Sequence, residues 1–248
     1  MQSSPIILIV VVCVFLLIIL MMVAFVIVAA GKGKARHDTL AKTLGLSLLE
    51  DTLTLLNRVA YVNNITRPEL YRVENVYSRH SSSGDVYMFG FHRRDVKKGQ
   101  TVGSKNHSSK IHYHPLETDV LAFVSSTWNL PHFAASPRVG GEGKLTAIAN
   151  QITEAAAGIK MEVVKFQHIP NLDDRYLIST SDFSASRISL PDAFLRTLSA
   201  NPNLTLHTGG DTLTISYANS ASQPPDAEKM KQLYKIGVQM ARDIPPKG

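Results

Sequence analysis

The feature that most limits the fold of this chain is an apolar run near its N-terminus. Residues 6–30 contain no charged and no amide side chain, and Ile6 and Ala30 mark the ends of the run. As an α-helix the run would be about 37 Å long, which exceeds the roughly 30 Å hydrocarbon core of a bilayer. We therefore predict one transmembrane helix over 6–30, preceded by a short non-cytoplasmic tail (1–5) and followed by a juxtamembrane stalk (31–44).

A cleaved signal peptide is the alternative to a membrane anchor. Val28 and Ala30 are small enough to precede a cleavage site, but the run is about twice the usual length of a signal peptide's apolar part, and no Lys or Arg stands before it. Lys32, Lys34 and Arg36 follow the run directly. Because positive residues favour the cytoplasmic side, the sequence predicts a single-pass signal-anchor in the cell (inner) membrane, with the following domain in the cytoplasm.

The remainder of the chain combines strand and helix patterns over residues 45–244. It begins with a helix break at Leu44-Gly45-Leu46 and a short helix over 51–61. The elements expected after that are strands at 72–78, 86–93, 119–127 and 129–136, a helix at 145–158, strands at 161–168 and 175–180, a helix at 191–200, a hairpin at 204–217 and a helix that starts at Asp226. This order predicts an α+β domain of antiparallel β-hairpins with packed helices.

The order helix, strand, turn, strand occurs at 51–93 and again at 191–217. Two similar halves, 45–137 and 145–244, would explain the repetition, and so would the frequent use of a common unit. Periodicity also predicts which side chains share a face. Leu53, Leu56 and Val59 recur at helical spacing in the first helix, Tyr87, Phe89 and Phe91 share one face of the second strand, and the inner stripe of the last helix is Met230, Leu233, Gly237 and Met240.

The order and spacing of these elements resemble a widespread set of uncharacterised bacterial proteins that carry one or two N-terminal spans and a soluble α+β domain. The matching features, over about 44–244, are Leu44-Gly45-Leu46, the hairpin from Val73 through Asn75-Val76 to Phe89, the segment NLPHFAASP at 129–137, Arg175-Tyr176 with Asp182, the helix at 193–198 and the GGD hairpin. The resemblance implies a membrane-anchored bacterial protein and no particular chemistry. The stretch 91–115 departs from the set because it is longer and more basic.

This stretch, 91–115, carries six Lys or Arg, one Asp and four His, so it holds +5 of the chain's net charge of +6. Its histidines suggest a metal site, because two imidazoles on one side of a strand ligate Zn²⁺ or Ni²⁺. The candidate ligands are His112 and His114 with His107, Glu117 or Asp119 as further ligands, and His107, His112, His114 and Asp119 form the preferred set. Lys105 and Lys110 argue against a bound cation, because they repel it. No other cofactor is expected.

The same basic residues suggest contact with the anionic surface of the membrane. The candidate contacts are Lys32, Lys34, Arg36, Arg93, Arg94, Lys97, Lys98, Lys105 and Lys110. A solvated loop that keeps the neighbouring strands soluble is the other interpretation. Nucleic acid is not an expected partner, because the cluster has no regular basic face and no interleaved aromatic residues.

No complete catalytic motif is present. The chain has no HExxH, CxxC or GxSxG pattern, its single Cys13 lies in the apolar run, and GGEGKLT at 140–146 lacks the first Gly and the Ser or Thr of a phosphate loop. His168 and His207 lie in expected strands and have structural roles in the simplest interpretation. An enzyme, in the form of a metal-assisted hydrolase, is therefore the weaker hypothesis.

The sequence favours a non-enzymatic interaction or scaffold module at the cytoplasmic face. Its expected partners are the lipid bilayer and another membrane or cytoplasmic protein. Pro131 predicts an edge strand or a strand start, since proline cannot donate to a sheet. An exposed strand over 129–136 would offer Trp128, Pro131 and Phe133 as a contact surface. Ordinary core packing of Trp128 and Phe133 is the competing interpretation.

Overall fold

The computed structural model describes residues 14–15, 17–22, 35–82, 84–94, 113–138, 162–181 and 190–247. The chain divides into two compact units, Met1–Leu40 and Ala41–Gly248. The described residues of the first unit are helical. Among all described residues, no helix has both the length and the apolar character that crossing a membrane requires. Most of the run 6–30 lies outside the described residues, so the membrane span stays a prediction.

The second unit begins with the end of a helix. The N–H of Leu46 donates to the carbonyl of Ala41 (2.9 Å), and the N–H of Gly45 donates to the carbonyl of Lys42 (3.1 Å). These two bonds are those of a Schellman motif, in which the residue after the helix is left-handed. Gly45 has a φ of +68°, which glycine adopts without a steric penalty. The helix break predicted at this point is confirmed.

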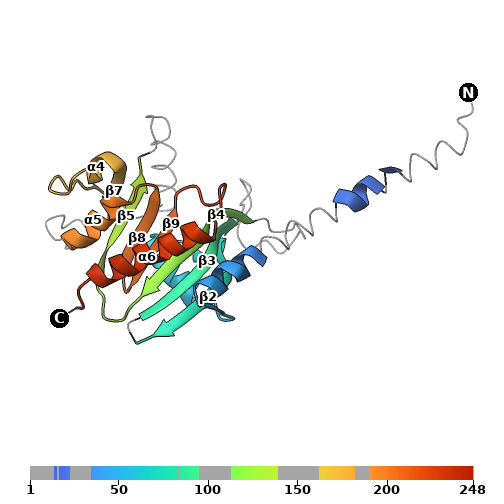
Figure 1. Ribbon diagram of the computed structural model, residues 1–248, viewed down its shortest axis with the longest axis horizontal. Helices are drawn as coiled ribbons and strands as arrows, with labels where there is room; N and C mark the ends of the chain where they lie inside the picture. The colour runs from blue at the N-terminus through green and yellow to red at the C-terminus, as the bar shows by residue number, and fades with distance from the viewer. Residues whose placement is uncertain are drawn as a thin grey trace, which may run out of the picture. The chain divides into compact units, whose positions relative to one another are not determined.

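One antiparallel sheet forms the body of the second unit (Figure 1). Its nine described strands lie in the order β1-β2-β3-β4-β9-β8-β5-β7-β6, and each neighbouring pair is antiparallel. The strands are β1 Ser47–Leu48, β2 Tyr71–Ser81, β3 Gly84–Arg94, β4 Tyr113–Val124, β5 Leu130–Pro137, β6 Glu162–Val163, β7 Tyr176–Thr180, β8 Leu204–Gly210 and β9 Thr212–Tyr217. The α+β class and its antiparallel hairpins are therefore as predicted.

The two halves suggested by the sequence belong to this one sheet. Helix α2 Leu53–Val62 precedes β2 and β3, with the short 3-10 helix η1 Pro68–Leu70 between them, and helix α5 Asp192–Ala200 precedes β8 and β9. However, β4 pairs with β9, and β5 pairs with both β8 and β7. One strand from 45–137, β5, thus lies among strands from the second half, so the two segments share one sheet. The similarity of the two halves stays a prediction.

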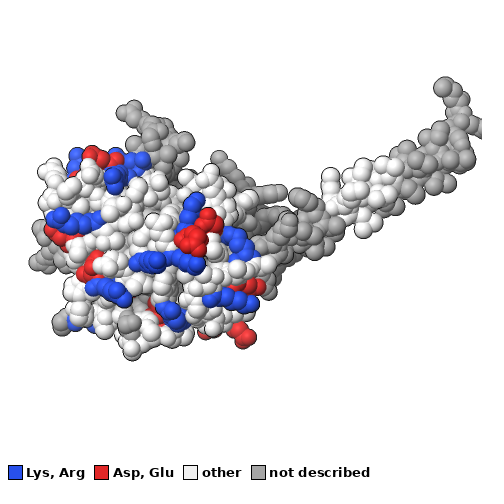
Figure 2. All heavy atoms as spheres, viewed as in Figure 1, with Lys and Arg blue, Asp and Glu red and all other residues white. Residues whose placement is uncertain are grey.

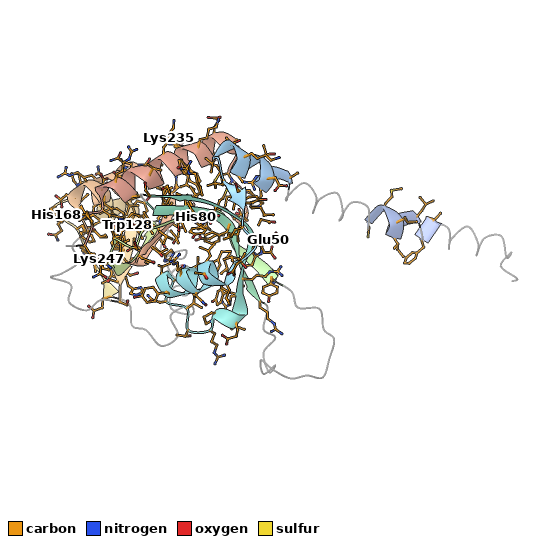
Figure 3. All side chains as sticks on the ribbon, turned by 90° about the horizontal axis from the view of Figure 1, so that it is seen from below. Glu50, His80, Trp128, His168, Lys235 and Lys247 are labelled. Atoms are coloured by element: carbon orange, nitrogen blue, oxygen red, sulfur yellow. The ribbon has the colours of Figure 1, made fainter. Side chains whose placement is uncertain are left out.

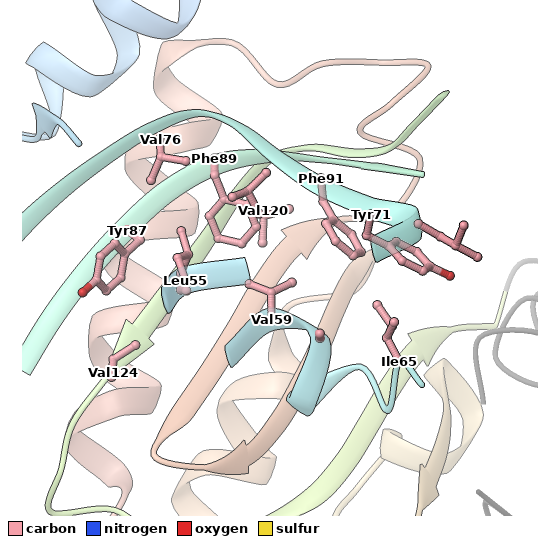
Figure 4. Packing of buried hydrophobic residues seen from close by; sticks show 14 residues of the cluster. Leu55, Val59, Ile65, Tyr71, Val76, Tyr87, Phe89, Phe91, Val120 and Val124 are labelled. Carbon is pink, nitrogen blue, oxygen red and sulfur yellow. The ribbon is translucent and has the colours of Figure 1, made fainter. Parts of the chain in front are cut away.

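Helix α2 packs on one face of the sheet. Leu55 and Val59 of α2 lie among Phe89, Phe91 and Val120 of the sheet (Figure 4). The full cluster consists of Leu55, Val59, Ala60, Ile65, Leu70, Tyr71, Val73, Val76, Tyr87, Phe89, Phe91, Val120, Ala122 and Val124. The prediction that Tyr87, Phe89 and Phe91 share one face is therefore confirmed, and this face points toward α2.

The short helix predicted over 51–61 is confirmed as α2, Leu53–Val62. Leu53 is 64% exposed, whereas Leu55, Val59 and Val62 are at most 2% exposed. The buried stripe of α2 therefore begins at Leu55. Leu53 lies in the first turn, where an N–H has no carbonyl of its own helix to bind, and it donates instead to Oδ1 of Asp51 (3.1 Å).

The opposite face of the sheet is covered by α6 Ala227–Asp243, which packs on β4 and β9 and beside α5 (Figure 1). Oδ1 of Asp226 accepts the N–H of Lys229 (2.9 Å), which confirms the predicted N-cap. The predicted inward residues are buried; they are Met230, Leu233, Gly237 and Met240. A Cβ atom on Gly237 would overlap the ring of Phe123, so glycine allows α6 to lie close to β4.

Strand β5 is an interior strand, so the prediction of an exposed contact strand is wrong. β5 lies between β8 and β7, Trp128 is 8% exposed and Phe133 is 1% exposed. Pro131 is the second residue of β5, beside a register shift between Leu130 and Phe133. Such an irregularity accommodates a residue without an N–H inside a sheet. Trp128 and Phe133 are core residues.

The segment before β7 also differs from the prediction. The expected strand at 161–168 is only the two-residue β6, and Asp173 and Asp174 lie in a short helix, α4 Leu172–Arg175, rather than in a hairpin turn. Both carboxylate oxygens of Asp173 accept the N–H of Phe166 (2.9 and 3.0 Å). This local bond stabilises a compact turn in place of a longer strand.

Candidate binding site

The predicted metal site is described only in part. His107 and His112 lie outside the described residues. His114 is exposed at the start of β4, whereas Asp119 is fully buried with a left-handed φ of +57°. Within the described ranges, no group of three or more His, Cys, Asp or Glu side chains is arranged to hold a metal ion. The metal site stays a prediction.

The predicted membrane contacts are also described only in part. Lys32, Lys34, Lys97, Lys98, Lys105 and Lys110 lie outside the described residues, and Arg36 belongs to the first unit. Arg93 and Arg94 lie at the end of β3, opposite His114 and Tyr113 of β4. On β2, the guanidinium group of Arg72 lies 3.8 Å above the ring of Tyr113. Three arginines thus gather at one end of β2 and β3, where Arg72 also forms an ion pair with Glu74. By contrast, basic and acidic side chains are interspersed on the α6 face (Figure 2).

The sheet carries a second surface that the sequence did not single out. Side chains alternate between the two faces of a strand, so Thr205, His207, Thr214 and Ser216 lie on the α2 side, while Leu206, Leu213 and Ile215 face α6. The residues of this surface, which we call the polar face, are Thr205 and His207 of β8, Thr214 and Ser216 of β9, His132, Ala134 and Ser136 of β5, and Ser179 of β7.

One row of the polar face crosses four strands. His207 lies opposite Thr214 on one side and Ala134 on the other, and Ala134 in turn lies opposite Ser179. Neighbouring strands are about 5 Å apart, so the imidazole of His207 and the hydroxyl of Ser179 flank the small side chain of Ala134. Ser136 follows Ala134 by two residues and therefore lies on the same face. Among these polar side chains, Ala134 contributes only a methyl group.

Helix α2 borders this row at His132. The rings of Tyr61 and His132 are 4.4 Å apart, and Tyr61 is 55% exposed. A Cβ atom on Gly209 would lie 2.9 Å from Nδ1 of His132 and 3.4 Å from Tyr61, so a larger residue at this position would displace the imidazole ring. The C-terminal part of α2 thereby places an aromatic ring at the margin of the polar face.

Two ionisable groups in this region have strongly shifted pKa values. Burial lowers the pKa of His207 to about 4, so its imidazole is neutral at neutral pH. Burial raises the pKa of Glu117 on β4 to about 6, and the bond donated by Oγ of Ser216 (2.9 Å) opposes this rise. Neither group shifts the pKa of the other. Glu117 and His207 therefore act as separate groups, with β9 between their strands.

The polar face holds a hydroxyl group without a hydrogen-bond partner among the described residues. Ser179 is 5% exposed, and its Oγ atom makes no hydrogen bond within the part of the chain that the structure describes. Ser136, Thr214 and Ser216 are also at most 7% exposed. A buried hydroxyl that lacks a partner destabilises a protein by about 1–3 kcal/mol. A bound molecule with a polar group at this point would remove that cost.

A separate network of ion pairs and hydrogen bonds connects α2 with the β2–β3 hairpin and the β8–β9 turn. His80 Nδ1 lies 2.9 Å from Oδ1 of Asp85, and the hydroxyl of Tyr87 donates to Oδ2 of Asp85 (3.3 Å). Arg58 of α2 bonds to Tyr87 and lies 3.4 Å from Asp211 in the β8–β9 turn. These groups satisfy one another, so we assign them to the attachment of α2.

Of the two histidines predicted to lie in strands, His168 and His207, only His207 does so. His168 lies in a turn at the edge of the domain, 3.2 Å from Asp192, and not in a strand (Figure 3). His207 lies in β8 as predicted. The sequence did not reveal the polar face, because alternation of Leu with Thr, Ser and His is typical of a strand whose polar side is solvated. In this fold the same alternation occurs on strands whose polar side is largely buried.

The roles of these residues rest on their geometry in this chain. The chain matches none of the family models, curated proteins or solved structures with which it was compared.

Proposed function

We propose that the protein is a membrane-anchored, non-enzymatic binding module at the cytoplasmic face and that the polar face binds a small molecule. The apolar run 6–30 supports the anchor, because its length and composition suit a membrane-spanning helix. The row His207, Ala134 and Ser179 carries the binding role. In this row, the half-buried imidazole of His207 and the buried hydroxyl of Ser179 flank a residue with a minimal side chain, and Ser179 has no partner among the described residues.

A small molecule suits this face better than a protein partner. Most of the polar side chains are enclosed, whereas a macromolecular surface contacts groups that protrude or line an open patch. Small-molecule sites are typically enclosed and contain a few polar groups that converge on one position. The predicted contact residues Trp128 and Phe133 are core residues, so they provide no alternative surface.

The geometry favours binding over catalysis. General acid–base catalysis requires groups that reach the same reacting atoms. Glu117 lies on β4 and His207 on β8, with β9 between them, which separates the two strands by about 10 Å. Glu117 also lies five residues along β4 from Ala122, the residue level with Thr214 and His207, so the two backbones are farther apart than that. Glu117 is occupied by the hydroxyl of Ser216. The two shifted groups are therefore poorly placed to share a proton.

Equilibrium dialysis of the full-length protein in detergent micelles against a small-molecule cell extract, followed by mass spectrometry, tests the proposal. The wild type should enrich a molecule that Ala134→Leu does not, because the larger side chain fills the centre of the row. Ala200→Leu is the matched control, since Ala200 is exposed on α5. Enrichment of no molecule by the wild type, or equal enrichment by Ala134→Leu, would contradict the proposal.

Circular dichroism shows whether Ala134→Leu remains folded. Ser179→Ala gives a second comparison, because it removes one oxygen atom that has no partner among the described residues and adds no bulk. A ligand that binds this hydroxyl should be enriched less by Ser179→Ala than by the wild type.

A second role, docking on anionic lipid, is favoured by the position of Arg72, Arg93 and Arg94 at neighbouring strand ends. Each arginine near an anionic surface contributes about 1 kcal/mol. A chain that lacks residues 1–34 should float with anionic vesicles and less so after Arg93→Ser and Arg94→Ser. Equal flotation with neutral and anionic vesicles would exclude this role.

A further inference from the structure

The outer side of helix α2 carries a row of three exposed, uncharged side chains. Leu55 and Val59 of α2 point toward the sheet (Figure 4), whereas Leu53 is 64% and Tyr61 55% exposed. Asn57 lies midway between Leu53 and Tyr61 along the helix and is also exposed. Residues four apart lie on the same side of an α-helix. We call Leu53, Asn57 and Tyr61 the α2 ridge.

The composition of α2 is unusual for a helix on the surface of a domain. Arg58 is its only charged residue, and the guanidinium group of Arg58 lies 3.4 Å from Oδ2 of Asp211. The solvent side of α6, by comparison, includes charged side chains such as Glu228 and Lys235. A helix that faces water ordinarily has charged and polar residues on its outer side. A ridge that exposes a leucine and a tyrosine without any charge is therefore suited to contact with another molecule.

We infer that the α2 ridge joins two copies of this chain, with each α2 antiparallel to the other about a two-fold axis at Asn57. In this register Leu53 of one copy lies against Tyr61 of the second copy, because both residues are four positions from Asn57. The two Asn57 side chains meet at the axis, where each amide both donates and accepts a hydrogen bond. A two-fold contact brings the same surface of both copies together, so an uncharged ridge meets its own copy without repulsion.

A second copy fits the ridge better than an anionic membrane surface does. Helices that lie on such a surface are rich in Lys and Arg on their polar side, whereas the one arginine of α2 is paired with Asp211. Glu50 and Asp51 directly precede α2, and an anionic surface would repel them. The contact is short, since the ten residues of α2 span about 15 Å, so the dimer should dissociate readily.

Disulfide trapping of the full-length protein in detergent micelles tests the contact. Cys13→Ala removes the natural cysteine, and Asn57→Cys then places one thiol at the axis. Packed helices have axes about 8–10 Å apart, which brings facing Cα atoms within the roughly 7 Å that a disulfide can span. Gln232→Cys is the matched control, because Gln232 is exposed on α6 of the same chain. We expect Asn57→Cys to form the linked dimer about tenfold faster than Gln232→Cys.

Sedimentation equilibrium measures the dimer without a cross-link and tests the antiparallel register. Leu53→Glu should raise the dissociation constant by about tenfold or more, because each dimer loses the same apolar contact twice. Tyr61→Lys should weaken the dimer for the same reason. The variant with both substitutions should dimerise more tightly than either single variant, since the register sets each new carboxylate beside a new ammonium group. Circular dichroism checks that each variant keeps its fold.

Three results would overturn the inference. A monomeric wild type would exclude a second copy on the α2 ridge. Equal cross-linking of Asn57→Cys and Gln232→Cys, or unchanged dimerisation of Leu53→Glu, would place the contact between copies elsewhere in the chain. A variant with both substitutions that dimerises no more tightly than the single variants would reject the antiparallel register, because a parallel pair would set like charges together.

Discussion

The substitution Glu117→Gln should stabilise the protein at neutral pH and have little effect at acidic pH. The pKa of Glu117 rises from 4.5 in the unfolded chain to about 6 in the folded protein. The folded state therefore binds the proton more tightly, and wild-type stability falls as the pH rises through this interval. The shift of roughly 1.5 pKa units corresponds to about 2 kcal/mol above pH 6. This is an upper value, because Glu117 retains some exposed surface.

A glutamine side chain cannot ionise, so the Glu117→Gln variant avoids this penalty while its amide oxygen still accepts from Ser216. For a domain of this size, about 2 kcal/mol corresponds to a rise in Tm of about 4–8 °C. Thermal unfolding of the full-length protein in detergent, followed by circular dichroism, should show this rise at about pH 7.5 and almost none at about pH 4. His207 also titrates between these values, but it is present in both proteins and cancels in the difference.

The matched control is Glu228→Gln on α6, where the glutamate side chain is 82% exposed. Its Tm difference from the wild type should be small at both pH values, since an exposed ion pair contributes little. The reasoning about Glu117 would be refuted if the difference between Glu117→Gln and the wild type were the same at both pH values, or larger in acid.

Other predictions concern the packing, the helix cap and the anchor. Gly237→Ala should lower the free energy of unfolding, measured with urea, by about 1–3 kcal/mol. The added methyl group overlaps the buried ring of Phe123, and this overlap outweighs the roughly 1 kcal/mol by which alanine favours a helix over glycine. An unchanged urea midpoint would contradict the close packing of α6 on β4. Asp226→Ala should cost about 1 kcal/mol through loss of the bond to the N–H of Lys229, and Asp226→Asn, which keeps the acceptor, should restore most of it. The full chain should remain in the pellet after carbonate extraction of membranes, whereas a chain without residues 1–34 should not; release of the full chain would contradict an anchor at 6–30.

Local signals in the sequence predicted two helix ends correctly. Gly45 marks the end of a helix and Asp226 the start of another, because a left-handed glycine and a capping carboxylate act on their own neighbours in the chain. The hairpin at 204–217 has the predicted alternation around Gly209-Gly210. Errors arose where a local signal has two structural solutions. Pro131 suits an edge strand or an irregular interior strand, and Asp173 suits a hairpin turn or a short helix.

The candidate site could not be predicted from the sequence in the same way. Its residues come from β5, β7, β8 and β9, and Ala134 meets His207 although 72 intervening positions separate them. Alternation along β8 shows that Leu206 and His207 point to opposite faces, but it does not show what lies beside either face. The pairing of β5 with β8 decides that question.

The sequence by itself determined the apolar run at 6–30, the α+β class, the hairpins and the caps, because each depends on residues close together in the chain. Only the tertiary structure decided which strands pair, that β5 is interior, and that the polar sides of β8 and β9 are largely enclosed. Strand pairing depends on contacts between distant residues, and burial depends on what those contacts bring together. The same alternation of leucine with serine, threonine and histidine would serve a solvated strand, so only the fold reveals Ser179 as a buried hydroxyl that no described residue satisfies.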